Sequence, residues 1–254
     1  MLPASTSSSS PSPAAVHVFD MSDLELWAAF KKTKKKAIIP IGSLEQHGPH
    51  LPVSTDTLIA EHVSRLVAQK VDALVLPALA YGVSFEHDPM FHVSLRNSTL
   101  SAMVCDMCAS LAGHGISDIV IINGHHGNIG ALQYIAQDLG GRIPSGTSIN
   151  VLHYWHQMKE RELGHAGEVE TSLMLAIAPE LVRMDRAKAG IKKPTKSKAA
   201  YASIANSPGS FVKITGNGVW GDPKNASAET GHRLLEEIIA GLARTITFEL
   251  ASSD

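Results

Sequence analysis

The stretch Ala37-Ile-Ile-Pro-Ile-Gly-Ser-Leu-Glu-Gln-His47 decides the fold class, because an apolar run passes through a glycine directly into polar residues. A short apolar run rich in isoleucine is typical of a buried strand. Side chains alternate along a strand with a period of two, so Glu45 and His47 would share one side while Gln46 faces the other. The sequence therefore predicts a Glu-x-His pair at the end of a buried strand.

Outward from this strand, apolar runs alternate with helical patterns. Strands are expected at residues 37–41, 73–76, 118–122 and 148–152, and helices at 23–32, 57–69, 99–112, 129–138, 168–177 and 229–248. This alternation indicates βαβ units with right-handed crossovers, and hence an α/β fold with a mainly parallel sheet and helices on both faces. A chain of 254 residues suits one such domain, which we expect over residues 16–254.

Two segments fit no strand or helix. Residues 1–15 are rich in Ser, Pro and Ala, so little of them can be buried and a disordered tail is expected. This tail lacks the basic and apolar regions of a secretory signal. Residues 187–218 show no clear period, which predicts a loop or a flap that covers the substrate.

The composition argues against several kinds of partner. A net charge of −2 gives no broad basic surface for nucleic acid. No apolar run reaches the roughly 18 residues that a membrane span needs. The only two cysteines, Cys105 and Cys108, share one helical pattern, which favours buried small side chains over a zinc or redox site. We therefore expect a cytoplasmic protein that acts on a small molecule.

The residues after the first strand suggest a metal site. Gly48, Pro49 and Pro52 bend the chain, and Asp56 then opens the next helical pattern. An Asp at a helix start is often an N-cap. Together with the Glu-x-His pair, however, Asp56 forms the mixed nitrogen and oxygen set that a divalent metal requires.

A histidine pair follows the third expected strand, in Asn123-Gly-His-His-Gly-Asn128. The glycines let the backbone turn tightly, so His125 or His126 can point back over the end of the strand. Ligands bind at the carboxyl ends of the strands in an open α/β sheet. This segment is therefore a second candidate for metal ligation.

Two carboxylates open the helix expected at residues 168–177, within Gly164-His-Ala-Gly-Glu-Val-Glu-Thr-Ser172. Glu168 and Glu170 lie about 200° apart around a helix, so only one of them is expected to face the site. The other carboxylate would complement the positive end of the helix dipole.

These motifs, in this order, resemble those of the creatininase (creatinine amidohydrolase) family, whose pattern also includes Gly218-Val-Trp-Gly-Asp-Pro223. The resemblance implies a creatininase-like α/β/α sandwich that hydrolyses carbon–nitrogen bonds other than peptide bonds. It also implies one or two divalent ions (Zn, Fe or Mn) and a homo-oligomer, often a hexamer. The implied metal ligands are Glu45, His47, Asp56 and His125, with Glu170 completing a two-metal site.

His165 is the catalytic residue that the resemblance implies. In the family the histidine of this motif lies beside the metals and moves protons, a task that the ordinary His pKa of about 6.5 suits. The residues expected to contact the substrate or to support the metal ligands are His50, His126, Asn128 and Glu168. By contrast, Glu86, His87 and His92 flank the Pro-containing stretch Asp88-Pro-Met-Phe91; they could line the pocket, but the sequence alone favours a surface position.

One position departs from the family pattern. Creatinine-hydrolysing members of the family carry an acidic metal ligand two residues after the histidine that corresponds to His125. This chain has Gly127 at that position. The second metal would then take its carboxylate from Glu170 or be absent. This difference counts against creatinine and favours the family's formamide deformylases, which act on a formylaminopyrimidine nucleotide in archaeal flavin and deazaflavin biosynthesis. Hydrolysis of creatinine or another cyclic amide is the alternative, and the family also includes a peptidase of mycofactocin maturation.

A function of a different class is a non-catalytic nucleotide-binding module, with residues 123–128 as a phosphate cradle. This segment lacks the G-x-G-x-x-G pattern and the Lys of a P-loop. A phosphate cradle needs none of the carboxylates, so metal retained after dialysis would separate the two functions. The basic residues within 192–198 could meet a substrate phosphate in either case.

Overall fold

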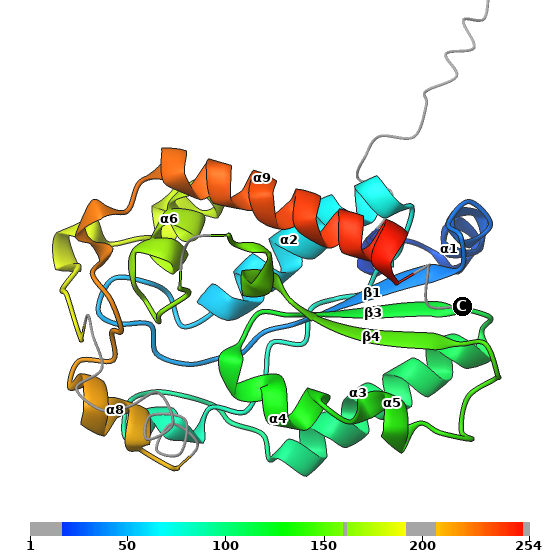
Figure 1. The fold of residues 1–254 in the computed structure, drawn as a ribbon, viewed down its shortest axis with the longest axis horizontal. Helices are drawn as coiled ribbons and strands as arrows, with labels where there is room; N and C mark the ends of the chain where they lie inside the picture. The colour runs from blue at the N-terminus through cyan, green and yellow to red at the C-terminus, as the bar shows by residue number, and fades with distance from the viewer. Residues whose placement is uncertain (1–16, 160–161, 192–206, 251–254) are drawn as a thin grey trace, which may run out of the picture.

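The sheet consists of four parallel strands in the computed structural model, which describes residues 17–159, 162–191 and 207–250 (Figure 1). The strands are β1 (Lys36–Ile41), β2 (Leu74–Val75), β3 (Asp118–Asn123) and β4 (Ser148–His153), in the order β2-β1-β3-β4. All four predicted strands are confirmed, with bounds that differ by one residue at most.

Helices connect the strands and close the domain. Those of the described residues are α1 (Asp23–Phe30), α2 (Thr55–Val71), α3 (Asn97–Gly113), α4 (Ile129–Leu132), α5 (Ile135–Asp138), α6 (Glu168–Ile177), α8 (Ser210–Thr215) and α9 (Ala228–Arg244). None of the helices in this part of the chain is long and apolar enough to cross a membrane.

Two expected elements differ from the structure. Residues 129–138 form α4 and α5 instead of one helix, because Tyr134 leaves the helical region with φ −114° and ψ 12°. The expected loop at 187–218 contains α8, whose six residues lie between Gly209 and Gly216. A helix of this length is too short to show a period in the sequence. The rest of that segment from 192 to 206, with its basic residues, and the expected tail at 1–15 lie outside the described residues.

Helices cover both faces of the sheet because the strand side chains alternate between two apolar layers. Ile38 and Val120 pack with α2, α6 and α9 on one face, whereas Ile39 and Ile121 pack with α3, α4 and α5 on the other (Figure 1). The predicted α/β/α architecture is confirmed. Cys105 and Cys108 are free thiols, and both are buried in the layer of α3.

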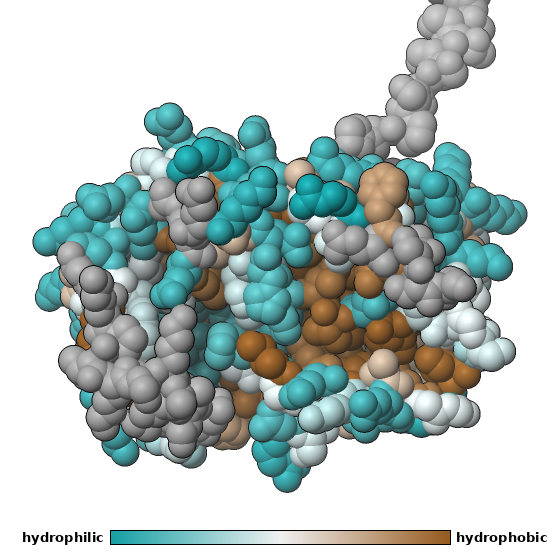
Figure 2. Space-filling view, in the orientation of Figure 1, coloured by the Kyte–Doolittle hydropathy of each residue, from teal (hydrophilic) through white to brown (hydrophobic). Residues whose placement is uncertain are grey.

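β4 forms one edge of the sheet, and all six of its residues are only half-buried. Apolar side chains gather in Figure 2 where Figure 1 places this strand, between α9 and α5. An open apolar edge of this kind is a potential surface for another chain.

Gly231 allows α9 to lie close against α6. A Cβ atom at this position would overlap the backbone oxygen of Ser172 and would lie 2.9 Å from the Cβ of Ala176. The absence of a side chain is therefore what lets these two helices meet.

We expect Gly231→Ala to destabilise the protein, because α9 must move away from α6. Overpacking of this kind costs about 1–3 kcal/mol, more than alanine gains as a helix former. Urea unfolding followed by circular dichroism measures the loss. Gly113→Ala is the matched control, since a Cβ there meets no atom within 4 Å. Equal stabilities of the two variants would contradict the packing argument.

Candidate functional site

The predicted metal ligands meet at the carboxyl ends of the strands. Glu45 and His47 come from the loop after β1, Asp56 from the first turn of α2, His125 from the loop after β3, and Glu170 from the first turn of α6. All five side chains are buried, with residue exposures of 4% or less. The structure therefore brings together groups that are as far as 125 residues apart, from 45 to 170.

The strand period does not explain how Glu45 and His47 come together. β1 ends before both residues, so the prediction that strand alternation aligns them is wrong. Isolated bridges place them instead, between Glu45 and His92 and between His47 and both Pro49 and Leu51. The side chains of Glu45 and His47 nevertheless approach the same point, as expected.

Asp56 stands at the centre of the cluster. Its Oδ1 lies 3.1 Å from His47 Nε2, and its Oδ2 lies 3.0 Å from His125 Nδ1. The alternative of an N-cap does not hold, because Ser54 occupies the N-cap position of α2. The carboxylate thus directs one oxygen toward each of two imidazoles.

A backbone carbonyl orients His47. Nδ1 of this ring lies 3.1 Å from the carbonyl oxygen of Glu45, which can only accept a hydrogen bond, so Nδ1 carries the hydrogen. Nε2 is left to face Asp56 Oδ1 at 3.1 Å and Glu170 Oε2 at 3.9 Å. Metal-binding histidines typically donate their other ring N–H to a carbonyl in this way.

Three buried carboxylates make the site strongly negative. Burial opposes a charge on His47, but the carboxylates of Asp56 and Glu170 outweigh it and raise the pKa of His47 to about 10. Burial, reinforced by the charge of Asp56, raises the pKa of Glu170 to about 7. Imidazole nitrogens lie 3.0 Å from Glu45 Oε1 and from Asp56 Oδ2, but neither buried oxygen has a partner in hydrogen-bonding geometry among the described residues. A divalent cation would neutralise this charge and satisfy these oxygens, so the residues present fit a metal.

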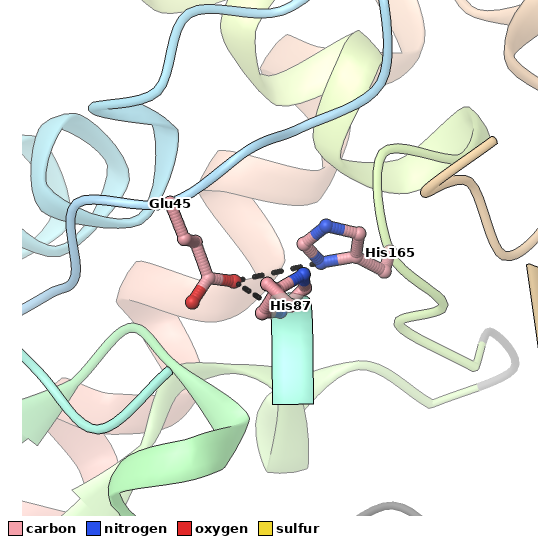
Figure 3. A group of neighbouring side chains, drawn as sticks. All are labelled: Glu45, His87 and His165. Carbon is pink, nitrogen blue, oxygen red and sulfur yellow. Dashed lines mark ion pairs between the residues drawn. The ribbon is translucent and has the colours of Figure 1, made fainter. Parts of the chain in front are cut away.

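His165 joins the cluster from the segment before α6. Its Nε2 lies 3.0 Å from the backbone oxygen of Gln46, and its Nδ1 lies 3.9 Å from Glu45 Oε1 (Figure 3). Its ring centroid is 4.3 Å from that of His47. The backbone of His165 pairs with Trp220, donating at 3.0 Å and accepting at 2.8 Å. The predicted catalytic histidine therefore lies beside the predicted metal ligands.

The turn η2 (Phe85–His87) brings two further side chains into the site, where the sequence predicted a surface position. His87 Nε2 lies 3.0 Å from Glu45 Oε1 (Figure 3), and Glu86 Oε1 lies 3.8 Å from His125 Nε2. His87 is 2% exposed, so the surface prediction was wrong for it and for the pocket-lining Glu86. His92 does not line this pocket.

Backbone pairing explains the position of this turn. Gln46 N–H donates to the carbonyl of Phe91 at 2.8 Å, and Val93 N–H donates to that of Leu44 at 2.9 Å. These hydrogen bonds fold the segment after β2 onto the loop after β1. The only signal in the sequence is an adjacent Glu and His, which does not by itself distinguish a site from a surface.

Gln46 lies among the site histidines, although strand alternation would have turned it away. Its Oε1 accepts the N–H of Gly48 at 2.9 Å, which fixes the orientation of the amide. Its Nε2 therefore donates to Nδ1 of His87 at 2.8 Å. The hydrogen on the His87 ring is then on Nε2, the atom that faces Glu45.

His50 and Asn128 do not line the pocket and instead contact neighbouring segments. His50 Nε2 lies 2.9 Å from Thr171 Oγ1. Asn128 Oδ1 accepts the N–H of Val83 at 2.9 Å, while its Nδ2 donates to the carbonyl of Gly42 at 3.0 Å. Of the two roles expected for these residues, the structure favours support of the ligand segments over contact with a substrate.

An open pocket of about 510 Å³ leads to the cluster. Trp155, Phe211 of α8 and Trp220 line it together with His126. Glu168 instead lines a separate depression next to Trp220, so of the two helix carboxylates only Glu170 faces the site. Flat apolar walls above a polar floor suit a small molecule.

An open parallel sheet with buried imidazoles and carboxylates at its carboxyl edge defines a candidate metal-dependent α/β hydrolase. The family model "Creatininase: Creatinine amidohydrolase" matches residues 20–246 of the chain. The chain belongs to the creatininase family of amidohydrolases. This confirms the predicted family and the predicted class of enzyme.

Relatives with established names cover most of the chain. It is 30% identical over 237 residues to creatinine amidohydrolase of Pseudomonas putida, which corresponds to 84% of this chain and 88% of that protein. It is 33% identical over 226 residues to the mycofactocin precursor peptide peptidase of Mycolicibacterium smegmatis, or 82% of this chain and 83% of that protein. A crystal structure of creatinine amidohydrolase has a TM-score of 0.77 at 30% identity, and the match covers 92% of this chain and 97% of that one.

The names of two similar solved structures include a metal. One is a creatininase variant of Zn–Zn type, with a TM-score of 0.76, and another is a manganese creatininase, with a TM-score of 0.77. Deformylases of the family are also similar to this chain, but over a smaller part of its length. The enzyme of Methanobrevibacter ruminantium that deformylates 2-amino-5-formylamino-6-ribosylaminopyrimidin-4(3H)-one 5'-monophosphate is 31% identical over 146 residues, or 56% of this chain.

We expect Asp56→Ala to remove most of the bound divalent metal, because it deletes the carboxylate that faces both imidazoles. Elemental analysis after dialysis measures the metal that remains. Asp106→Ala, which removes an exposed carboxylate on α3, should retain the metal content of the parent protein. Unchanged metal in the Asp56 variant would overturn the assignment of this cluster.

The two carboxylates of α6 should differ sharply in their effects. Glu170→Gln should lower metal content or turnover by orders of magnitude, because Glu170 Oε2 faces His47 Nε2. Glu168→Gln should have a mild effect, since Glu168 lies outside the pocket that holds the cluster. Metal content and turnover measured on both variants test this ranking, and the reverse order would contradict the geometry.

Proposed function

We propose that this protein is a divalent-metal-dependent amidohydrolase that cleaves a carbon–nitrogen bond of a small amide. The observation that carries the proposal is the pair of imidazoles facing the two oxygens of Asp56. His47, Asp56 and Glu170 would hold one ion, while Glu45 and His125 would contribute to a second. When bound, such ions polarise an amide carbonyl and lower the pKa of water toward neutrality.

His165 is proposed to deliver a proton to the departing nitrogen. Its Nε2–H donates to the backbone oxygen of Gln46, so Nδ1 is the atom that faces the site. Burial and the neighbouring His47 lower the pKa of His165. Nδ1 is therefore unprotonated at neutral pH, so it would first accept the proton that the attacking water releases and then give that proton to the departing nitrogen.

We propose a formamidopyrimidine nucleotide as the first candidate substrate. Gly127 leaves this chain without the acidic side chain that the resemblance assigns to creatinine-hydrolysing members. The aromatic walls formed by Trp155 and Trp220 suit a flat ring. A peptide is a second candidate, favoured by the 33% identity to a peptidase over 82% of the chain. Creatinine is a third candidate, favoured by the relative from Pseudomonas putida.

A direct assay distinguishes these substrates. Protein reconstituted with Zn, Mn or Fe is incubated separately with a formamidopyrimidine nucleotide, creatinine and short peptides. Formate, creatine and free amines are then measured. We expect formate from the nucleotide. Creatine or free amines without formate would show that another amide is the substrate. The absence of product from every amide tested would contradict the proposed activity.

We also propose that the chain forms a homo-oligomer in the cytoplasm. The uncovered apolar edge at β4 supports self-association. Analytical ultracentrifugation of the full chain tests this proposal, and a monomer at all concentrations would contradict it.

His165→Ala separates proton transfer from metal binding. If His165 donates the proton, the variant should keep its metal and lose about 10²–10⁴-fold in turnover. The loss should be smaller for amides whose leaving amine is less basic, because protonation then matters less. His92→Ala, which changes a histidine outside the pocket, is the control. Loss of metal in proportion to activity, or an equal loss across the amide series, would remove His165 from this role.

A further inference from the structure

The space around Gly127 is already occupied by other groups. A Cβ atom at this position would overlap the carbonyl oxygen of Val83 and the Nε2 of His125, and it would lie 2.7 Å from Glu86 Oε1. Real Cβ atoms essentially never approach other atoms so closely. The Val83 backbone and the His125 ring therefore require a glycine here, and the carboxylate of Glu86 lies in the same space.

Glu86 reaches this point from a different part of the chain. It belongs to η2, and its side chain is 16% exposed within the pocket wall. The N–H of Val83, three residues earlier, donates to Asn128 Oδ1 at 2.9 Å. One residue later, His87 contacts Glu45 Oε1 at 3.0 Å. The turn is thus held from both sides, which directs the carboxylate of Glu86 toward His125.

We propose that Glu86 is a metal ligand, and that it supplies to the second ion the carboxylate that Gly127 does not carry. One ligand atom from each of Glu45, Glu86 and His125 lies within 4.8 Å of the others, a separation that a single ion can bridge. His125 Nε2 lies 3.2 Å from Glu45 Oε2 and 3.8 Å from Glu86 Oε1. This inference rests on the proposed function, because it presumes a metal-dependent site.

The second nitrogen of His125 supports the same assignment. Nε2–H donates to the Val83 carbonyl at 2.8 Å, as Nδ1–H of His47 does to the Glu45 carbonyl, and this leaves the Nδ1 lone pair free for an ion. Nδ1 lies 3.0 Å from Asp56 Oδ2, so an ion bound to Nδ1 would also be within reach of Asp56. A backbone carbonyl behind the ring of a metal-binding histidine is a common arrangement.

The ligands then divide into two sets with Asp56 between them. His47 faces Asp56 Oδ1 and Glu170, whereas His125 faces Asp56 Oδ2 and also approaches Glu45 and Glu86. Each set contains at least one imidazole and one carboxylate. The original expectation that Glu170 replaces the missing acidic residue is therefore revised, because Glu170 faces His47 and Glu86 faces His125.

Manganese titration of the full-length protein tests this proposal. Wild type, Glu86→Gln and the control Glu162→Gln are stripped with a chelator, and Mn²⁺ binding is followed by calorimetry and elemental analysis. Glu162 is an exposed carboxylate that lines the same pocket, so its variant removes the same charge. We expect two ions in wild type and in the control, and the loss or an at least tenfold weakening of one ion in Glu86→Gln.

Gly127→Ala provides a second variant, because it leaves every proposed ligand in the sequence but crowds both His125 and Glu86, the two ligands proposed for the same ion. We expect it to weaken the same ion, with circular dichroism showing that the fold is retained. If Glu86→Gln binds manganese with the stoichiometry and affinity of wild type, the role of Glu86 is refuted while the proposed function stands. A raised KM with unchanged metal binding refutes it equally. If wild type binds no manganese, the proposed function itself fails.

Discussion

Asp56 carries a negative charge into the interior of the protein and places one oxygen against each of two imidazoles. Burying an unpaired carboxylate costs several kcal/mol, and here Glu45 and Glu170 add two more. The cluster is stable only because opposite charge is held within about 3 Å, by protonated imidazoles or by cations. Formation of the site and folding of the surrounding loops are therefore coupled.

The sheet determines where Asp56 can stand. Ile41 at the end of β1 pairs with Asn123 at the end of β3, so the loops that follow begin side by side. Each loop begins with a glycine. A Cβ at Gly124 would lie 2.6 Å from the backbone oxygen of Asp56, and one at Gly42 would overlap the next residue of α2. The first turn of α2 can approach the strand ends only because neither glycine has a side chain.

The order of apolar and polar residues predicted the elements that depend on neighbouring residues alone. The isoleucine-rich runs predicted β1 and β3 to within one residue, and the polar motif after the first run predicted Glu45, His47 and Asp56 as ligands. The resemblance to the family, and not local pattern, selected His125 over His126 and Glu170 over Glu168. The sequence favoured a surface position for Glu86 and His87. Backbone hydrogen bonds between two loops that are distant in sequence bring them into the site, and no pattern in their own segment predicts those bonds. The strand argument for Glu45 and His47 reached the correct pairing for the wrong reason, since the chain leaves the sheet before them.

Two backbone hydrogen bonds join His165 to Trp220. His165 faces the buried cluster, and Trp220 forms a wall of the pocket that leads to it. Because the two backbones share these hydrogen bonds, a substitution that shifts Trp220 would also shift His165. Trp155 lines the same pocket from a separate segment after β4, so a substitution there would change the pocket without passing through the backbone of His165.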